Sequence, residues 1–287
     1  MIPEKVIRYS FPDTEVSYQE REVILYALGV NVGLDPMNER ELKYLYEEGL
    51  QALPSYSMVL GHPGFWLRDP ALEVDWVKLL HAEQFLSISR PLSANGTVLV
   101  SHNVLGIKDK GEGRGAIVYY EKLLRDAETK EELCRVTTGV FCRGDGGCGD
   151  YGEAPVPLAA MPEQTPDMSI SKKTDPRSAM IYRLSGDYNP LHIMPDIARQ
   201  AGYERPILHG LCSMGVVGLI LQETIGKSSP ELFGGYACRF SKPVFPGDTL
   251  RVDIWVDDME GRFRVVAEDR NEVVLDRGHF SLIAQEG

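Results

Sequence analysis

The sequence lacks three features that would each indicate a particular class of protein. It has no run of about 20 apolar residues, which a membrane-spanning helix requires. It has no GxGxxG loop set between a strand and a helix, as dinucleotide binding requires, because its match to that pattern, Gly144–Gly149, lies in a stretch rich in Gly and Pro. Lys and Arg number 30 against 42 Asp and Glu, for a formal net charge of −12, whereas proteins that bind nucleic acid through its phosphates are usually basic. We therefore expect no membrane and no nucleic acid among its partners, although local Lys and Arg can still bind a small anion.

Paired cysteines are also missing. The chain has five cysteines, an odd number, and no C-x-x-C pair. The first residues, MIPEKVIRYSF, contain no apolar core of a secretion signal, and the last, AQEG, do not form a peroxisomal address of the SKL type. We therefore expect reduced thiols, no metal site and a cytoplasmic location. The cysteines are Cys134, Cys142, Cys148, Cys212 and Cys238.

The 287 residues are enough for one large domain or two ordinary ones, and their pattern divides into two halves. The first, residues 1–150, opens with a helix, because Ser17 and Glu20 have capping-box spacing and Gly29 suits a helix end. A second helical stretch covers roughly 38–50. Strand-like runs rich in Val, Ile, Tyr and Thr follow at about 83–90, 97–107, 114–124 and 133–142.

A stretch rich in Gly and Pro separates the halves, and we take residues 151–176 as a crossing linker. The second half, residues 177–287, contains a short helix after Pro195 and a long apolar helix at about 208–225, which should be buried. Four strand runs follow, near 235–243, 248–256, 261–269 and 272–283. The pattern predicts an α+β double hot-dog fold, in which two long helices are each wrapped by a curved antiparallel sheet.

The run LSGDYNPLH carries the strongest chemical signal. Asp187, Asn189 and His192 fall within six residues, between the structure breakers Gly186 and Pro190. A carboxylate beside an imidazole forms a general acid–base pair that can bind one water, and the Asn amide can hold the loop or a ligand. Asp and Asn beside Gly and Pro are also common turn formers. The added His, followed by a buried helix, favours the catalytic interpretation.

Gly210 stands at the predicted start of the long helix. The first N–H groups of a helix lack internal partners and carry the positive end of its dipole. Such an N–H can hold the oxygen of a thioester carbonyl as negative charge develops on it, and glycine permits close approach. Tight helix packing explains a glycine here equally well.

Longer runs around these residues resemble a known family. YRLSGDYNPLHI from Tyr182 and AGYERPILHGL from Ala201 resemble the hydratase 2 motif of the MaoC-like dehydratase family, and RFSKPVFPGDTL from Arg239 is similar to its second signature. In the first half, EVILYALGV from Glu22, LKYLYE and LHAEQF resemble the hydratase 2 region of peroxisomal multifunctional enzyme type 2.

The resemblance implies a function and a set of roles. Asp187 and His192 would be the catalytic pair, Asn189 a positioning residue and Gly210 the oxyanion donor. The reaction would be reversible hydration of trans-2-enoyl-CoA to (3R)-3-hydroxyacyl-CoA, in β-oxidation of fatty-acyl or steroid side chains. The CoA thioester would be the substrate, with no cofactor. The first half, without a catalytic loop, would house the acyl chain, and the protein would act as a homodimer.

Further substrate contacts are predicted with a structural alternative beside each. His209 precedes a helix start, where capping or packing is a simpler role, and His62 is most simply a turn residue. His81 and Gln84 lie at the edge of a strand and could face the substrate. Gly146 and Gly147 belong to a glycine-rich loop, and Arg239 and Lys242 to a predicted strand; both pairs could meet CoA, or serve as linker and solvated face.

Two rival functions remain open. A hot-dog thioesterase generally places a lone carboxylate or its amide near a helix start, so the close pair of Asp187 and His192 favours hydration. A non-catalytic acyl-CoA-binding module is the other rival, and the intact set of Asp187, Asn189, His192 and Gly210 counts against it.

Overall fold

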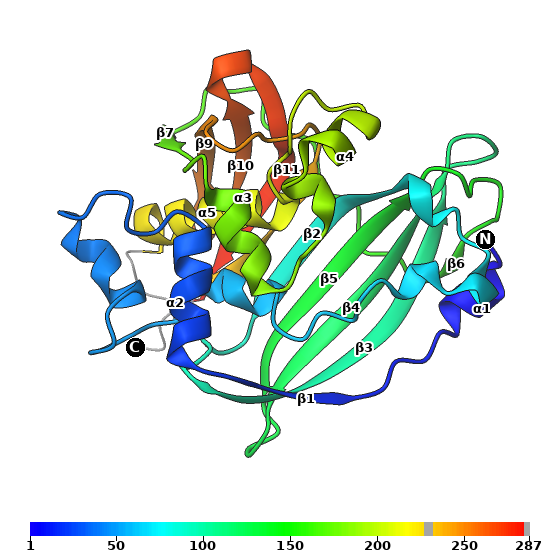
Figure 1. The fold of residues 1–287 in the computed structure, drawn as a ribbon, viewed down its shortest axis with the longest axis horizontal. Helices are drawn as coiled ribbons and strands as arrows, with labels where there is room; N and C mark the ends of the chain where they lie inside the picture. The colour runs from blue at the N-terminus through cyan, green and yellow to red at the C-terminus, as the bar shows by residue number, and fades with distance from the viewer. Residues whose placement is uncertain (227–231, 284–287) are drawn as a thin grey trace.

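One continuous antiparallel sheet runs through the described residues, which are 1–226 and 232–283 of this computed structural model (Figure 1). Its 11 strands follow the order β1-β3-β4-β5-β2-β8-β11-β10-β9-β7, with β6 paired to β3. The strands are β1 (Thr14–Tyr18), β2 (Leu79–Ile88), β3 (Gly96–Asp109), β4 (Ala116–Asp126), β5 (Glu132–Cys142), β6 (Tyr151–Gly152), β7 (Met168–Lys173), β8 (Phe233–Phe240), β9 (Thr249–Asp257), β10 (Glu260–Ala267) and β11 (Glu272–Leu282).

Short helices accompany this sheet. The α-helices are α1 (Pro3–Ile7), α2 (Glu20–Gly29), α3 (Ser178–Tyr182), α4 (Pro195–Gln200) and α5 (Gly210–Thr224). The 3-10 helices are η1 (Glu39–Tyr44), η2 (Pro54–Met58), η3 (Trp66–Arg68), η4 (Pro70–Leu72), η5 (Trp76–Lys78), η6 (Arg183–Ser185), η7 (Pro190–His192) and η9 (Glu268–Arg270). In the described part of the chain, no helix has both the length and the apolar character needed to cross a membrane.

Helix α5 is the centre of the core because it is apolar on nearly all of its faces. Two glycines let its neighbours approach closely. A Cβ on Gly215 would lie 2.5 Å from Val30 Cγ1, just past the end of α2, and a Cβ on Gly218 would lie 2.5 Å from the Tyr236 hydroxyl on β8. Helix α5 is therefore packed between α2 and the sheet, and this packing fixes where its first residue, Gly210, lies.

The two halves join where β2 pairs with β8. Glu83 of β2 is buried at this seam and accepts hydrogen bonds from Arg239 Nε at 3.0 Å and from the Tyr119 hydroxyl at 2.8 Å. A buried carboxylate needs such partners, since its desolvation would otherwise be costly. The seam thus links strands β2, β4 and β8.

The predicted α+β double hot-dog fold is confirmed, with one antiparallel sheet curving over a helix from each half (Figure 1). Helix α2, with 10 residues, is shorter than expected for a long helix, whereas α5 has 15. The predicted capping box was wrong, because Ser17 lies in β1 and the box is formed by Gln19 and Glu22. The stretch 38–50 contains only the 3-10 helix η1.

The proposed boundaries of the two units stay predictions. Within the expected linker 151–176 the structure has β6 and β7, and β7 forms an edge of the sheet beside β9. Polar alternation in Met168–Lys173 concealed this strand, since its exposed and half-buried residues alternate. The last four residues of the expected second unit, AQEG, and residues 227–231 lie outside the described part of the chain.

Candidate active site

The SGDYNPLH segment forms two short 3-10 turns, η6 and η7, separated by the loop that carries Asp187. Gly186 has a φ of 120°, a conformation that L side chains rarely adopt, and it lets the chain reverse before Asp187. Asn189 fixes the loop: its backbone N–H donates to Asp187 Oδ1 at 3.1 Å, and its side chain accepts from Leu191 N–H at 3.1 Å. The observed contacts of Asn189 are therefore positional.

Three side chains converge at this loop. One ligand-type atom each from Asp187, His192 and His209 lies within 4.8 Å of the others. The rings of His192 and His209 stack, with centroids 3.7 Å apart and planes 28° apart. His209 is 2% exposed and comes from the end of the loop that leads into α5. The fold thus brings together Asp187 and His209, which are 22 residues apart in the sequence.

The hydrogen bonds of the two imidazoles fix their tautomers. His192 Nδ1 lies 2.9 Å from the Ile207 carbonyl, and His209 Nε2 lies 3.2 Å from the Asp187 carbonyl. A carbonyl oxygen only accepts, so each of these nitrogens carries its proton. In a neutral ring, His192 Nε2 is then a lone pair free to accept a proton.

Both imidazole rings are neutral at pH 7 because burial lowers the pKa of each. Burial lowers the pKa of His192, although the hydrogen bond to the Ile207 carbonyl and the Asp187 carboxylate partly oppose this. Burial lowers the pKa of His209 to about 4, and the neighbouring His192 ring lowers it further. A neutral His192 beside a carboxylate is the arrangement that a general base requires at neutral pH.

Gly210 is the first residue of α5, and no side chain caps this helix end. The N-cap residue, His209, directs its ring to the Asp187 carbonyl instead. A Cβ on Gly210 would lie 3.1 Å from Phe240 Cε1, so tight packing is one reason for glycine here. The uncapped N-terminus is also the geometry that an oxyanion donor needs. The donor role stays a prediction.

His81 and Gln84 lie on the same side of the site. The Phe240 ring that packs on Gly210 has its centroid 4.6 Å from that of His81. His81 Nε2 lies 2.8 Å from Gln84 Oε1, which also accepts from the Thr138 hydroxyl at 3.1 Å. Burial lowers the pKa of His81 to about 4, and the charge on Asp187 is close enough to oppose that shift. The structure therefore brings His81 to the edge of the candidate site.

The other predicted substrate contacts lie elsewhere. Arg239 donates from Nε and Nη2 to Glu83 at the seam, and Lys242 is exposed beyond the end of β8 rather than on it. The backbone N–H of Gly147 donates to Asp109 Oδ1, and a Cβ on Gly146 would lie 2.2 Å from the Gly111 carbonyl. These contacts give Arg239, Gly146 and Gly147 structural roles, and a role in binding CoA stays a prediction for them and for Lys242.

His62 is a neighbour of the site that sequence reasoning missed. Its Nδ1 accepts from the Gly64 N–H at 3.0 Å, so it does belong to a turn, as predicted. Surrounding protein atoms desolvate the ring and lower its pKa to about 4, although the residue keeps an exposed surface, and the carboxylate of Asp187 opposes this shift. No spacing in one sequence could reveal this proximity, because 125 residues separate His62 from Asp187.

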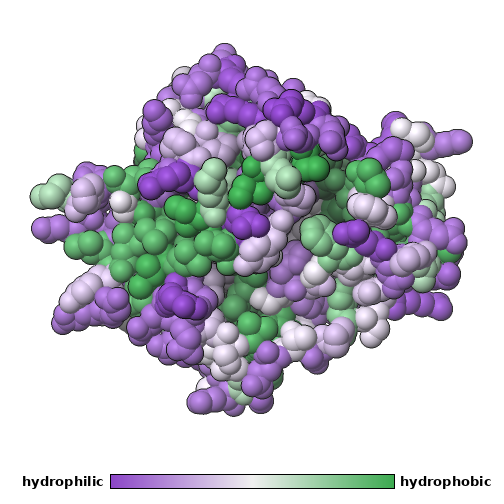
Figure 2. All heavy atoms as spheres, in the orientation of Figure 1, coloured by the Kyte–Doolittle hydropathy of each residue, from purple (hydrophilic) through white to green (hydrophobic). Residues whose placement is uncertain are grey.

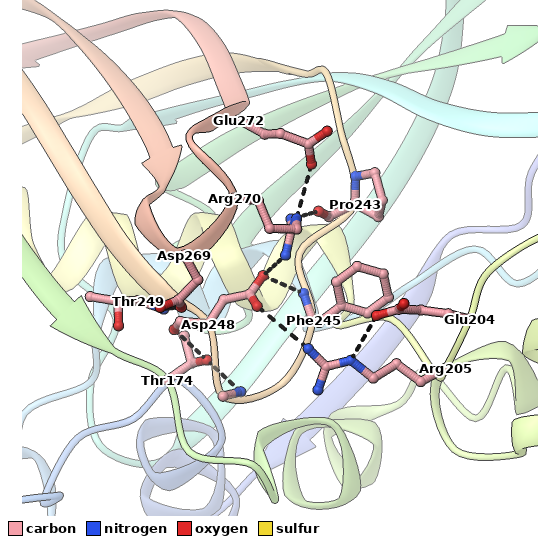
Figure 3. A network of polar contacts seen from close by, with 11 residues as sticks. Thr174, Glu204, Arg205, Pro243, Phe245, Asp248, Thr249, Asp269, Arg270 and Glu272 are labelled. Carbon is pink, nitrogen blue, oxygen red and sulfur yellow. Dashed lines mark hydrogen bonds and ion pairs between the residues drawn. The ribbon is translucent and has the colours of Figure 1, made fainter.

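The second signature, RFSKPVFPGDTL, builds a support behind the site (Figure 3). Asp248 is buried and accepts from Arg270 Nη1 at 2.5 Å and from the Phe245 N–H at 2.8 Å, with Arg205 Nη2 at 3.7 Å from its other oxygen. The guanidinium groups of Arg205 and Arg270 lie 4.7 and 4.8 Å from the centroid of the Phe245 ring. Arg205 belongs to the loop that leads to His209.

This support is also connected to the site by a backbone hydrogen bond. The Leu208 N–H donates to the Val244 carbonyl at 2.7 Å, immediately before His209 and Gly210. The turn around Asp248 thus holds the chain where α5 begins. Sequence reasoning found the signature but not its supporting role.

Comparison with known proteins agrees with this geometry. A family model for the MFE-2 hydratase 2 N-terminal domain matches residues 16–144, and one for the MaoC like domain matches residues 157–276. The chain is similar to the enoyl-CoA hydratase 2, peroxisomal, of Arabidopsis thaliana, with 33% identity over 94% of this chain and 92% of that protein. It is similar to peroxisomal multifunctional enzyme type 2 of Mus musculus, with 32% identity over 98% of this chain and 38% of that protein.

A solved structure of a similar protein shares this fold. The crystal structure of a MaoC-like dehydratase from Phytophthora Capsici has a TM-score of 0.85 against this chain and is 31% identical. The match covers 98% of this chain and 99% of that one. The fold is therefore shared over nearly the whole chain.

Proposed function

The chain belongs to the MaoC-like hydratase 2 family of enzymes, and from this premise we propose that it reversibly hydrates trans-2-enoyl-CoA to (3R)-3-hydroxyacyl-CoA. The observation that carries the proposal is the convergence of the Asp187 carboxylate and the neutral His192 imidazole beside the uncapped start of α5. The place of the reaction is β-oxidation of fatty-acyl or steroid side chains. A cytoplasmic location stays a prediction.

In the proposed mechanism the thioester carbonyl oxygen accepts a hydrogen bond from the Gly210 N–H, so that the enolate is stabilised as it forms. Asp187 and His192 Nε2 hold one water against C3 of the enoyl group. The pair takes one proton from this water as its oxygen bonds to C3, and one proton is delivered to C2. Protons and charge balance, and the thioester itself activates the double bond. The proposal therefore assigns no metal and no cofactor.

Two variants test the roles of the acid–base pair. Asp187→Asn and His192→Ala should each lower kcat for hydration by about 10²–10⁴-fold, the usual contribution of general acid–base catalysis. The matched control is Asp196→Asn, which removes an exposed carboxylate of α4 nine residues further on. Turnover is followed as loss of the enoyl absorbance, with circular dichroism to show that each variant is folded.

The same assay separates the rival functions. If both variants kept most of their turnover, the roles of Asp187 and His192 would be wrong. Release of free CoA thiol without loss of enoyl absorbance would instead indicate a thioesterase. Binding of an acyl-CoA without turnover of any substrate would indicate a binding module.

A homodimer is part of the proposal. Large apolar side chains are exposed over α2 and the segment after it, the green area to the left in Figure 2. A contiguous exposed apolar surface often marks a protein–protein interface. Light scattering should give twice the monomer mass, and Leu42→Glu should shift it toward the monomer. The exposed side chains of this surface include Leu28, Leu34, Met37, Leu42 and Tyr46.

A further inference from the structure

A polar row crosses the covered face of the first half's sheet. His102 of β3 and Lys122 of β4 are cross-strand partners. On one side of this pair lies an apolar cluster that includes Val100 and Leu124, and on the other side lies a separate cluster that includes Val104. The apolar core of this half is therefore interrupted where these two basic side chains lie.

Lys122 is 3% exposed, and its ammonium group is fully used. It donates to the carbonyls of Ser57 and Met58 at 2.9 Å each and to that of Leu60 at 2.7 Å. Ser57 and Met58 end η2 and Leu60 follows it, so Lys122 caps this helix and holds the segment after it. Among residues 1–226 and 232–283 it has no carboxylate within ion-pair distance. A buried positive charge without a negative partner is costly.

His62 follows directly after the segment that Lys122 holds. Gly61 has a φ of 66° and turns the chain, and Gly64 donates to His62 Nδ1. The proton of the neutral ring is therefore on Nε2, which donates to no group in the described part of the chain. The side chain is open to solvent, and it is near enough to Asp187 to feel its charge. This N–H is thus available beside the dyad.

His102 supplies a second group without a partner. Its Nε2 atom is buried and has no hydrogen bond within the described residues. Its ring lies 5.3 Å from that of Phe11, between centroids. An alkyl ligand that covered His62 would leave its Nε2–H desolvated and unpaired, which costs free energy. An oxygen acceptor would pair with this N–H.

We propose that His62, His102 and Lys122 form a polar subsite for the acyl chain, which takes a carboxylate carried on that chain beyond C3. The inference rests on the proposed function. His62 Nε2–H would donate to the carboxylate, and His102 would border it. Lys122 would act by its charge and as the positioning residue for the turn that carries His62. The preferred substrate would then be an ω-carboxyacyl thioester rather than a plain alkyl one.

The test uses pairs of trans-2-enoyl-CoA substrates of equal chain length that end in a methyl group or in a carboxylate, over a series of lengths. The readout is the ratio of kcat/KM for the two members of each pair. At the best length the wild-type ratio should favour the carboxylate. His62→Leu should lower that ratio by about tenfold or more, the usual worth of a hydrogen bond to a charged group, with little change for the methyl-ended substrate. His62→Gln, which keeps an N–H donor, should retain most of the preference.

A second variant addresses Lys122. Lys122→Met keeps the length of the side chain and removes the charge, and it should raise KM for the carboxylate substrate more than for the methyl one. Preference for the methyl substrate at every length, or an equal loss on both substrates in His62→Leu, would overturn the inference while the hydratase function stands. Absence of turnover on every pair by the wild type would overturn the proposed function, and the inference with it.

Discussion

The two halves of the chain each place a helix against the sheet, yet the N-termini of these helices differ. Helix α2 begins with a capping box, in which the Gln19 side chain accepts from a backbone N–H and the Glu22 side chain accepts from the Gln19 N–H at 3.0 Å. Helix α5 begins at Gly210 with no side-chain cap and no acidic residue in its first turn. N–H groups at the start of α2 therefore have side-chain acceptors, whereas those at the start of α5 have no side-chain cap.

This difference explains why one half alone carries the candidate site. A helix N-terminus stabilises an oxyanion only if its N–H groups are unpaired and nothing negative already occupies the positive end of the dipole. Glu20 and Glu22 already place negative charge at the start of α2. The first half instead has the polar row of His102 and Lys122, which suits ligand recognition. The element order is repeated, but the chemistry is divided between the halves.

The contrast between the two helix starts predicts a loss of activity when the unpaired N–H at the start of α5 is removed. Gly210→Pro deletes this donor, and proline suits the first position of a helix. We expect hydration to fall by about 10²–10³-fold, as when one oxyanion donor is lost. The measurement is kcat with an enoyl-CoA substrate.

Gly210→Ala is the matched control, because it adds the same Cβ against Phe240 and keeps the N–H. If the alanine and proline variants lost the same activity, packing rather than hydrogen bonding would be the reason for glycine.

A second prediction concerns the support behind α5. Asp248→Ala removes the carboxylate that holds Arg270 and the Phe245 N–H, and it leaves buried donors unpaired. We expect the free energy of unfolding to fall by about 2–4 kcal/mol, measured by urea denaturation. Asp269→Ala, at the exposed edge of the same network, should change it by less than about 0.5 kcal/mol. Equal effects would mean that the buried network does not support the loop.

The sequence predicted the parts of this asymmetry that are local. Asp187, His192, the breakers around them and the apolar run of α5 all lie within one stretch of 40 residues. The helix is confirmed in position, and the structure brings Asp187 and His192 together. The strands rich in Val, Ile and Tyr were likewise predicted, because their composition and alternation can be read from a short stretch of sequence.

Long-range relations were not predictable from one sequence. His62 meets the charge of Asp187, and Arg239 is held by Glu83, only because the two halves join at β2 and β8. The polar alternation of β7 resembled a linker, and Ser17 offered the same capping chemistry as Gln19 two residues early. In each case two interpretations fitted the local sequence almost equally well, and tertiary contacts determined which structure formed.

The third prediction concerns the capping box at the N-terminus of α2. Glu22→Ala removes one side of the capping box, and the free energy of unfolding should fall by about 1 kcal/mol. Hydration should change little, because Glu22 lies at the N-terminal end of α2, whereas Gly29 at its other end packs against Tyr182 and the catalytic loop. Thermal unfolding and kcat measured together check this. Loss of activity without loss of stability would show that α2 has a direct part in the reaction.

The smallest effect is expected from pH. Burial lowers the pKa of His192 from its ordinary value of 6.5, so the ring is mostly neutral at pH 7 and kcat/KM should change little between about pH 8 and pH 7. Activity should fall only below pH 6.5, when His192 takes up a proton and can no longer act as a base. The same shift weakens the fold in acid: the unfolded chain takes up this proton first, so the free energy of unfolding falls as the pH drops below 6.5. An acid limb with its midpoint at or above pH 6.5 would contradict a neutral His192.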